Sequence, residues 1–111
     1  MKRTDRQELL EAVRHLEVVR GHLAQSTADD QLVLDAAALR LSAAIDSVSR
    51  VPDELRRQVL EDSAWRAIEG MRNRLVDAYS FIDAAVMRTA LARDIKKLEA
   101  DIRLLLDQAG E

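Results

Sequence analysis

The sequence predicts an all-α protein, an antiparallel bundle of four to five helices, and three observations support this fold class. Apolar residues recur at alternating spacings of three and four along most of the chain, which is the periodicity of one helix face. One proline and three glycines leave few of the turns that an all-β fold needs. Capping residues separate the periodic segments and indicate the short connections of an antiparallel bundle.

The composition indicates a single folded domain over residues 1–111. With 48% apolar and 33% charged residues, the chain resembles a folded protein rather than a disordered one. No apolar run approaches the roughly 18–20 residues of a membrane span, no signal peptide is expected, and the lack of cysteine fits the cytoplasm. The net charge of −3 argues against nucleic-acid binding by the whole surface, so contact with RNA requires a local patch.

Two long helices are expected in the first half, at about residues 4–24 and 28–50. Thr4 and Gln7 fit a capping box at the start of the first helix. The second helix carries two apolar stripes: Leu34, Ala38, Leu41, Ile45 and Val48, and beside them Leu32, Ala36, Leu39 and Ala43. So wide an apolar face predicts a central position in the bundle. Asp46, close to the first stripe, is interpreted as a solvated residue at its edge.

The second half predicts a short helix at about residues 52–61 and two longer ones. Pro52 suits the first helical position because its missing N–H would have no partner there. Residues 62–63 are expected to cap the fourth helix, which should break near residues 88–89, with Thr89 as the cap of the last helix. The last helix places five apolar residues on one face and should end at Gly110. These five are Leu91, Ile95, Leu98, Ile102 and Leu105.

Residues 65–83 form the stretch most suggestive of chemistry, because they hold the only Trp, Tyr and Phe of the chain. Arg72 lies in an otherwise apolar stripe, where burying a guanidinium without a partner is costly. Tyr79 lies on the same side of the helix two turns later. A purely structural interpretation stays open, in which Asp77 pairs with Asn73 or with Arg74 at about 0.2–0.5 kcal/mol per pair.

Neither a metal site nor a cofactor is expected. His15 and His22 are the only histidines and lie seven residues apart, whereas metal-binding pairs on a helix are usually three to five apart. We interpret both as ordinary, partly exposed histidines.

Residues 65–83 also carry a resemblance to a known family. Their sequence, WRAIEGMRNRLVDAYSFID, resembles the signature of HepT-like proteins, the toxin branch of the HEPN superfamily. Residues 41–52 resemble the family's segment before its short third helix, with Asp46 where an acid is usual, and residues 94–98 resemble its last helix. The resemblance thus covers nearly the whole chain, and its Gly-Met-Arg-Asn core is fairly specific.

The resemblance implies a homodimeric, metal-independent endoribonuclease that acts on RNA, with tRNA and messenger RNA as candidate substrates. It also implies a HEPN/MNT toxin–antitoxin module, whose nucleotidyltransferase antitoxin silences the toxin by attaching AMP to a tyrosine. The family motif is an Arg, four intervening residues, a His, one residue and a Tyr. Arg72 and Tyr79 match its ends, and Asn73 matches the Asn that commonly follows the Arg. Arg72 would then grip the scissile phosphate, and Tyr79 would be the modified residue.

Asp77 stands where the family has histidine. Metal-free RNA cleavage needs a base for the 2′-OH and an acid for the leaving 5′-oxygen, and imidazole can serve as either near neutral pH. An aspartate with a pKa of about 4 is ionised at pH 7 and cannot act as the acid. We therefore expect weak or no nuclease activity. A natural degenerate member and a toxin inactivated by a His-to-Asp change both fit this residue.

The spacing of the motif points to a composite site. Positions 72 and 77 are five residues apart, which is about 140° around a straight helix. The two side chains cannot simply point together, so the site needs either a long, bent Arg72 or the second subunit of a dimer. This favours the composite cleft that the resemblance implies. Two other hypotheses stay open: a non-catalytic dimer that binds a nucleotidyltransferase or RNA, and a helical adaptor in which the arginines are structural.

Overall fold

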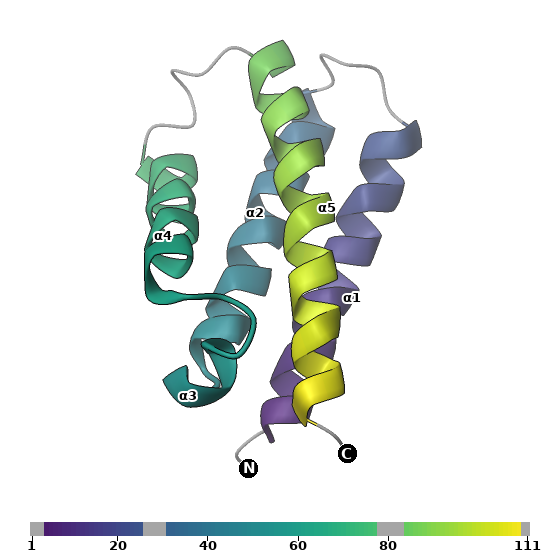
Figure 1. The fold of residues 1–111 in the computed structure, drawn as a ribbon. Coiled ribbons are helices and arrows are strands. Elements are labelled where there is room, and N and C mark those ends of the chain that lie inside the picture. The colour runs from purple at the N-terminus through teal and green to yellow at the C-terminus, as the bar shows by residue number, and fades with distance from the viewer. Residues whose placement is uncertain (1–3, 26–30, 78–83, 110–111) are drawn as a thin grey trace.

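The computed structural model describes residues 4–25, 31–77 and 84–109, and no strand occurs among them. Its helices are α1 (Asp5–Gln25), α2 (Gln31–Ser49), α3 (Asp53–Arg56), α4 (Asp62–Asp77) and α5 (Ala84–Ala109). The long helices alternate in direction along the chain and form a bundle of 40 × 26 × 26 Å (Figure 1). The prediction of an all-α fold is confirmed.

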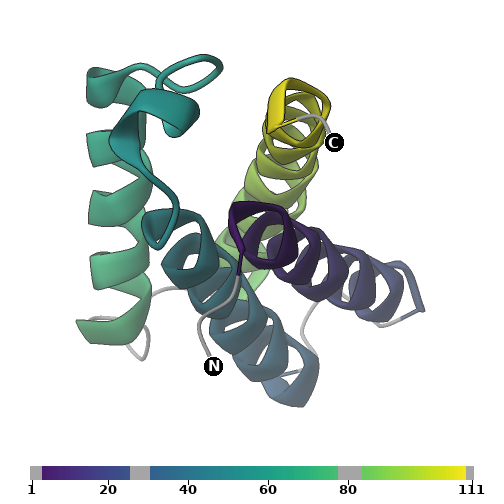
Figure 2. The same cartoon turned by 90° about the horizontal axis from the view of Figure 1, so that it is seen from below.

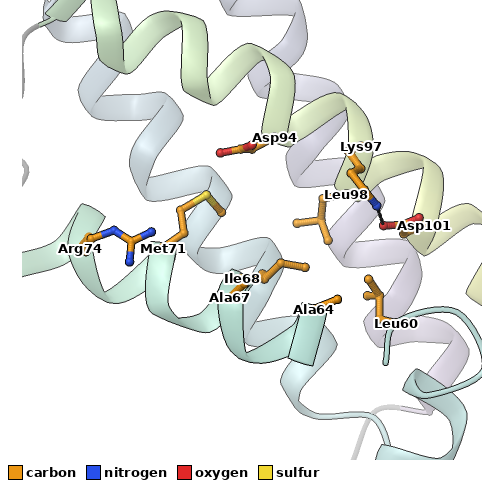
Figure 3. Close-up of a pocket in the computed structure, with 10 residues that line it drawn as sticks. All are labelled: Leu60, Ala64, Ala67, Ile68, Met71, Arg74, Asp94, Lys97, Leu98 and Asp101. Carbon is orange, nitrogen blue, oxygen red and sulfur yellow. Dashed lines mark hydrogen bonds and ion pairs between the residues drawn. The ribbon is translucent and has the colours of Figure 1, made fainter. Parts of the chain in front are cut away.

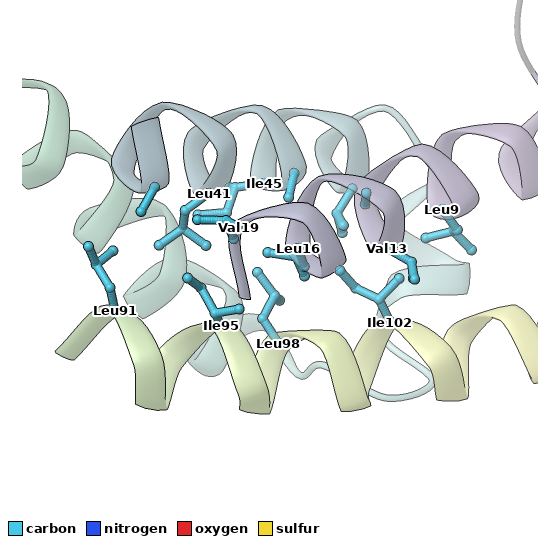
Figure 4. Packing of buried hydrophobic residues seen from close by; sticks show 14 of the residues in the cluster. Leu9, Val13, Leu16, Val19, Leu41, Ile45, Leu91, Ile95, Leu98 and Ile102 are labelled. Carbon is cyan, nitrogen blue, oxygen red and sulfur yellow. The ribbon is translucent and has the colours of Figure 1, made fainter. Parts of the chain in front are cut away.

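The core lies between α1, α2 and α5, which pack together along their lengths, while α4 stands to one side against α2 (Figure 2). α2 contacts α1, α4 and α5, so its predicted central position is confirmed. The largest fully buried side chains come from these three long helices (Figure 4). They are Leu9, Leu16, Val19, Leu34, Leu41, Ile45, Val48, Leu91, Ile95, Ile102 and Leu105.

The capping box at the start of α1 is confirmed. The Gln7 N–H donates to Thr4 Oγ1 at 3.1 Å, and the Thr4 N–H donates to Gln7 Oε1 at 2.8 Å. The two reciprocal bonds satisfy backbone donors that have no partner within the helix, which fixes the first turn.

Only one of the two apolar stripes of α2 is buried. Leu34, Leu41 and Ile45 are at most 1% exposed, whereas Leu32 is 78% and Leu39 is 73% exposed. Ala36 is exposed and Ala43 is half-buried on the same side of the helix. The position of α2 was thus predictable, but the apolar pattern did not show that the second stripe would face solvent.

The expected helix over residues 52–61 is shorter than predicted. α3 is a single turn, and Pro52 precedes it as the N-cap residue instead of occupying the first helical position. After Arg56 the backbone turns, with i→i−3 bonds from the N–H groups of Gln58 and Val59. A side-chain contact that periodicity does not reveal stabilises this turn: Arg56 Nη1 donates to the Leu60 carbonyl at 2.7 Å.

The expected helix break at residues 88–89 is wrong, because α5 is continuous from Ala84 through these positions. Arg88 Nη2 donates to the Leu23 carbonyl and ties this part of α5 to the end of α1. Tertiary contacts of this kind override the weak preference of Thr89 for a cap. Gly110, the expected end of the last helix, lies outside the described residues.

Candidate functional site on helices α2 and α4

The start of α4 is anchored by a buried arginine. The guanidinium of Arg56, which is 4% exposed, lies 5.7 Å from the ring centroid of Trp65, itself 7% exposed. Arg56 Nη2 also donates to Asp62 Oδ1 at 2.9 Å. A cation over an indole face and a charge-assisted hydrogen bond together fix the angle at which the chain enters α4.

Asp62 binds arginine side chains and does not serve as the expected N-cap of α4. α4 begins at Asp62, so its carboxylate lies in the first turn, where it binds two arginines instead of a backbone N–H. Hydrogen bonds from Arg57 and from Arg56 lower the pKa of the Asp62 carboxyl and keep it ionised. A carboxylate near a helix N-terminus also interacts favourably with the helix dipole.

Arg72 has its charge partner on the neighbouring helix. Arg72 Nη2 donates to Asp46 Oδ2 at 3.3 Å. Arg72 Nε lies 3.0 Å from Asp46 Oδ1, close enough for an ion pair, although its N–H is not aligned for a hydrogen bond. The two side chains are 34% and 41% exposed, so water screens the pair only in part. Asp46 is therefore a bound partner that links α2 to α4, and not merely a solvated edge residue.

Asn73 and Arg74 take no part in the contact with Asp46. Asn73 is exposed, and its Oδ1 accepts a long hydrogen bond of 3.4 Å from Arg72 Nη1. Arg74 is exposed and contributes to a groove on the opposite side of α4. Of the three consecutive polar residues, only Arg72 reaches α2.

Two of the predicted site residues cannot be placed relative to this pair. Asp77 is the last residue of α4, and its side chain lies outside the described part of the structure. Tyr79 also lies outside the described residues. Arg72 and Asn73 are thus located, whereas the roles of Asp77 and Tyr79, and the local pairs expected for Asp77, stay predictions.

A groove of about 370 Å³ runs between α4 and α5 (Figure 3). Its floor is apolar, and its charged residues come from both helices: Arg74 on α4, and Asp94, Lys97 and Asp101 on α5. Lys97 Nζ donates to Asp101 Oδ2 at 2.8 Å along the α5 side. The apolar residues are Leu60, Ala64, Ala67, Ile68, Met71 and Leu98.

A second, polar depression lies between α1 and α2 and includes His15, Asp46 and Arg50. Both ring nitrogens of His15 have neighbours within the protein: Nδ1 lies 3.1 Å from Arg40 Nη1, and Nε2 lies 3.5 Å from Glu11 Oε1. Among the residues that the structure describes, no three His, Asp or Glu side chains are grouped so that they could hold a metal ion.

Sequence reasoning missed two parts of this arrangement. Nothing in the periodicity marks Arg56 as buried, because its partners are a carbonyl, an aromatic ring and Asp62 from three separate turns. The pairing of Arg72 with Asp46 could have been found by combining two signals. One was a guanidinium that needed a partner, and the other was an acid beside the apolar stripe of the preceding long helix.

The fold and the site define an all-helical protein in which an arginine of the fourth helix is held by a carboxylate of the second. A family model described as ribonuclease HepT-like matches residues 9–105. No curated protein and no solved structure matches the chain significantly. The chain belongs to the HepT-like family of the HEPN superfamily, which is a ribonuclease family.

The described helices carry no membrane segment: none has both the length and the apolar character needed to cross a bilayer.

Proposed function

We propose that this chain is the toxin component of a HEPN/MNT toxin–antitoxin module, built as a homodimeric endoribonuclease that needs no metal and weakened or silenced by Asp77. The observation that carries the proposal is the pairing of Arg72 with Asp46 in a chain of the HepT-like family. This pair holds the guanidinium of the family motif in a defined and partly exposed position.

RNA cleavage without a metal needs three contributions from the protein: a base, an acid and a positive charge at the phosphate. The 2′-oxygen of RNA attacks the adjacent phosphorus, the bond from phosphorus to the 5′-oxygen breaks, and a 2′,3′-cyclic phosphate forms. A base must take the 2′-OH proton, and an acid must give a proton to the leaving 5′-oxygen. Arg72 stabilises the charge that develops on the phosphate oxygens. Asp77, ionised at neutral pH, leaves the acid step unserved.

The Asp46 contact limits how Arg72 can meet a phosphate. Asp46 occupies the Nε and Nη2 edge of the guanidinium. Nη1 makes only a 3.4 Å bond to Asn73. A phosphate therefore binds through Nη1, or it displaces the carboxylate and takes the bidentate edge that suits phosphate geometry.

The decisive experiment replaces Asp77 with His. Asp77→His supplies a group that can transfer protons near pH 7, so RNA cleavage should rise by about 10²–10⁴-fold over the unchanged chain. The assay incubates the purified proteins with tRNA and with messenger RNA in excess EDTA and follows cyclic-phosphate ends.

The matched control is the double variant Asp77→His/Arg72→Ala, which keeps the imidazole but lacks the guanidinium and should leave RNA intact. If Asp77→His itself cleaves neither RNA, or cleaves only without EDTA, the proposed metal-independent activity is wrong.

The presence of Asp77 favours a second candidate, a non-catalytic dimer that binds the nucleotidyltransferase of the module. In this case the chain forms a stable complex with the product of the neighbouring gene, and Asp77→His gains no cleavage. In either case the antitoxin's target is Tyr79, whose hydroxyl oxygen attacks the α-phosphorus of ATP with loss of pyrophosphate. Co-purification of the two gene products together with the cleavage assay separates the two candidates.

A further inference from the structure

We infer that the groove between α4 and α5 binds a small zwitterion with an apolar body, such as a free α-amino acid with a large apolar side chain. The site is separate from the Arg72–Asp46 pair, and its ligand does not depend on the proposed ribonuclease function. Three features carry the inference: the gap between the two helices, the apolar floor, and a cation and an anion on opposite walls of the groove (Figure 3).

The groove exists because α4 and α5 are not packed closely on each other. Both helices pack on α2, and α5 packs also on α1. Neighbouring helices in a bundle usually fill the space between them with interdigitating side chains. Here a space of about 370 Å³ remains, which falls within the roughly 300–1,000 Å³ of ligand pockets in proteins.

The floor of the groove is apolar on both walls. Four of its side chains follow one face of α4 at spacings i, i+3, i+4 and i+7: Ala64, Ala67, Ile68 and Met71. Leu98 faces them from α5 (Figure 3). Ile68 and Met71 are only partly buried, so an apolar ligand that covers them removes further apolar surface from water. The two alanines leave the room that such a ligand needs.

The end of the groove nearest the C-terminus of α4 carries one cation and one anion. Arg74 lies there on the α4 wall and Asp94 on the α5 wall (Figure 3). Within the described part of the chain, Arg74 makes no hydrogen bond or ion pair. Asp94 Oδ1 lies 3.4 Å from Nε of Arg93, the preceding residue, whose side chain is 76% exposed. Both groups can therefore bind a ligand without breaking a strong internal contact.

The remaining charges of the groove neutralise each other. Lys97 Nζ donates to Asp101 Oδ2 at 2.8 Å, and both residues lie further along the α5 wall. They therefore add no net charge for a ligand to match. What the groove offers a ligand is one guanidinium, one carboxylate and an apolar surface beside them.

An apolar α-amino acid matches these three groups. Its carboxylate accepts charge-assisted hydrogen bonds from the Arg74 guanidinium, its ammonium donates to Asp94, and its side chain lies on the apolar floor. A ligand with only one charge fits less well. An apolar anion meets the Asp94 carboxylate as a like charge, and an apolar amine meets the Arg74 guanidinium in the same way.

The experiment titrates the isotope-labelled chain with L-phenylalanine and follows backbone amide shifts by nuclear magnetic resonance. Saturable binding with a dissociation constant of about 0.1–1 mM is expected for so small a ligand. Three comparison ligands each lack one feature: 3-phenylpropionate has no ammonium, 2-phenylethylamine has no carboxylate, and L-serine has no apolar body. Each should bind at least about 10-fold more weakly. The shifted amides should be those that line the groove.

Single substitutions assign each charge to its partner. Arg74→Gln should weaken L-phenylalanine by about 10-fold and leave 2-phenylethylamine unchanged. Asp94→Asn should weaken L-phenylalanine by a similar factor and leave 3-phenylpropionate unchanged. Arg66→Gln is the matched control, because Arg66 is exposed on α4 and does not line the groove, so this variant should bind as the unchanged chain does.

The titrations of the unchanged chain decide the inference without any variant. It is overturned if L-phenylalanine shows no saturable binding up to about 20 mM. It is also overturned if 3-phenylpropionate or 2-phenylethylamine binds as tightly as L-phenylalanine, because the ligand would then be a simple apolar ion. Amide shifts around the exposed Leu32 and Leu39, in place of the groove, would mean non-specific apolar binding and would equally contradict it.

Discussion

Arg72 illustrates how a charged side chain can occupy an apolar stripe at low cost. Its guanidinium reaches Asp46 on α2, and about a third of the side chain stays exposed to water. The pair thus avoids the large desolvation penalty of a fully buried charge. Its stability contribution should accordingly be modest, which leaves Arg72 free to serve a ligand.

A double-mutant cycle measures that contribution. Arg72→Gln and Asp46→Asn should each lower the free energy of unfolding, with a coupling energy of about 0.5–1.5 kcal/mol between them, since the contact is two-point but partly solvated. Urea unfolding of the two single variants and the double variant gives this value. Strictly additive effects would mean that the pair is not formed in solution.

Glu99 provides a pH-dependent link between α5 and α1. It is 8% exposed, and it accepts hydrogen bonds from Arg20 of α1 at 3.0 Å and from Arg103 at 2.9 Å. Burial alone would raise the pKa of Glu99, but the bonds from Arg20 and Arg103 outweigh it and lower the pKa. Since the folded pKa is depressed, the stability gained from Glu99 is fully present above the unfolded value and is lost as the pH falls through the folded value.

Glu99→Gln should therefore destabilise the protein at pH 7 by about 1–3 kcal/mol. The difference from the unchanged chain should shrink as the pH falls below the ordinary value of 4.5. Urea unfolding at several pH values between neutral and acid tests this. The other carboxyl groups affect both proteins equally, so their contributions cancel in the difference between the two free energies of unfolding. If this difference were the same at all pH values, the ionised Glu99 carboxylate would not be the source of the stability.

At the scale of elements, the buried Arg56 joins the one-turn helix α3 to the turn that follows it. Arg56 is 5% exposed at its side chain and bonds the Leu60 carbonyl and Asp62, whereas its neighbour Arg57 bonds the same Asp62 at 49% exposure. Arg56→Met should lower the free energy of unfolding by about 2–4 kcal/mol, because it leaves a buried carbonyl without its donor.

Arg57→Met is the matched control, since it removes an exposed partner of Asp62 and should cost less than about 1 kcal/mol. Thermal and urea unfolding of the two variants compare the arginines directly. If both variants lost the same free energy of unfolding, the burial of Arg56 would not explain its contribution to stability.

The elements also show what a sequence can predict. Long periodic segments predict α1 and α2 well, because many apolar residues repeat the same signal, and the Thr4–Gln7 capping box fixes the start of α1. The one-turn α3 and the continuity of α5 through Thr89 were missed. In both, a side-chain hydrogen bond that periodicity does not reveal is present: Arg56 bonds the Leu60 carbonyl four residues later, and Arg88 bonds the distant Leu23 carbonyl at the end of α1. The sequence pointed to Arg72 and to Asp46 but not to their contact.

At the scale of the whole molecule, α1, α2 and α5 share the core, and α4 is attached chiefly through α2. The exposed stripe of Leu32 and Leu39 lies on this central helix. The pattern of α2 could not predict which stripe faces solvent, because both have the same helical spacing. Only the packing of α1, α4 and α5 around α2 decides it.

The separation of α4 from α5 also affects how the molecule opens. α4 packs mainly on α2, and α1, α2 and α5 pack on one another, so an opening in which α4 alone swings away would cost less free energy than global unfolding. Arg72 lies on the helix that opens. A molecule that fills the groove between α4 and α5 would favour the closed state, and by thermodynamic linkage its binding would strengthen any ligand that requires Arg72 to be in place beside Asp46.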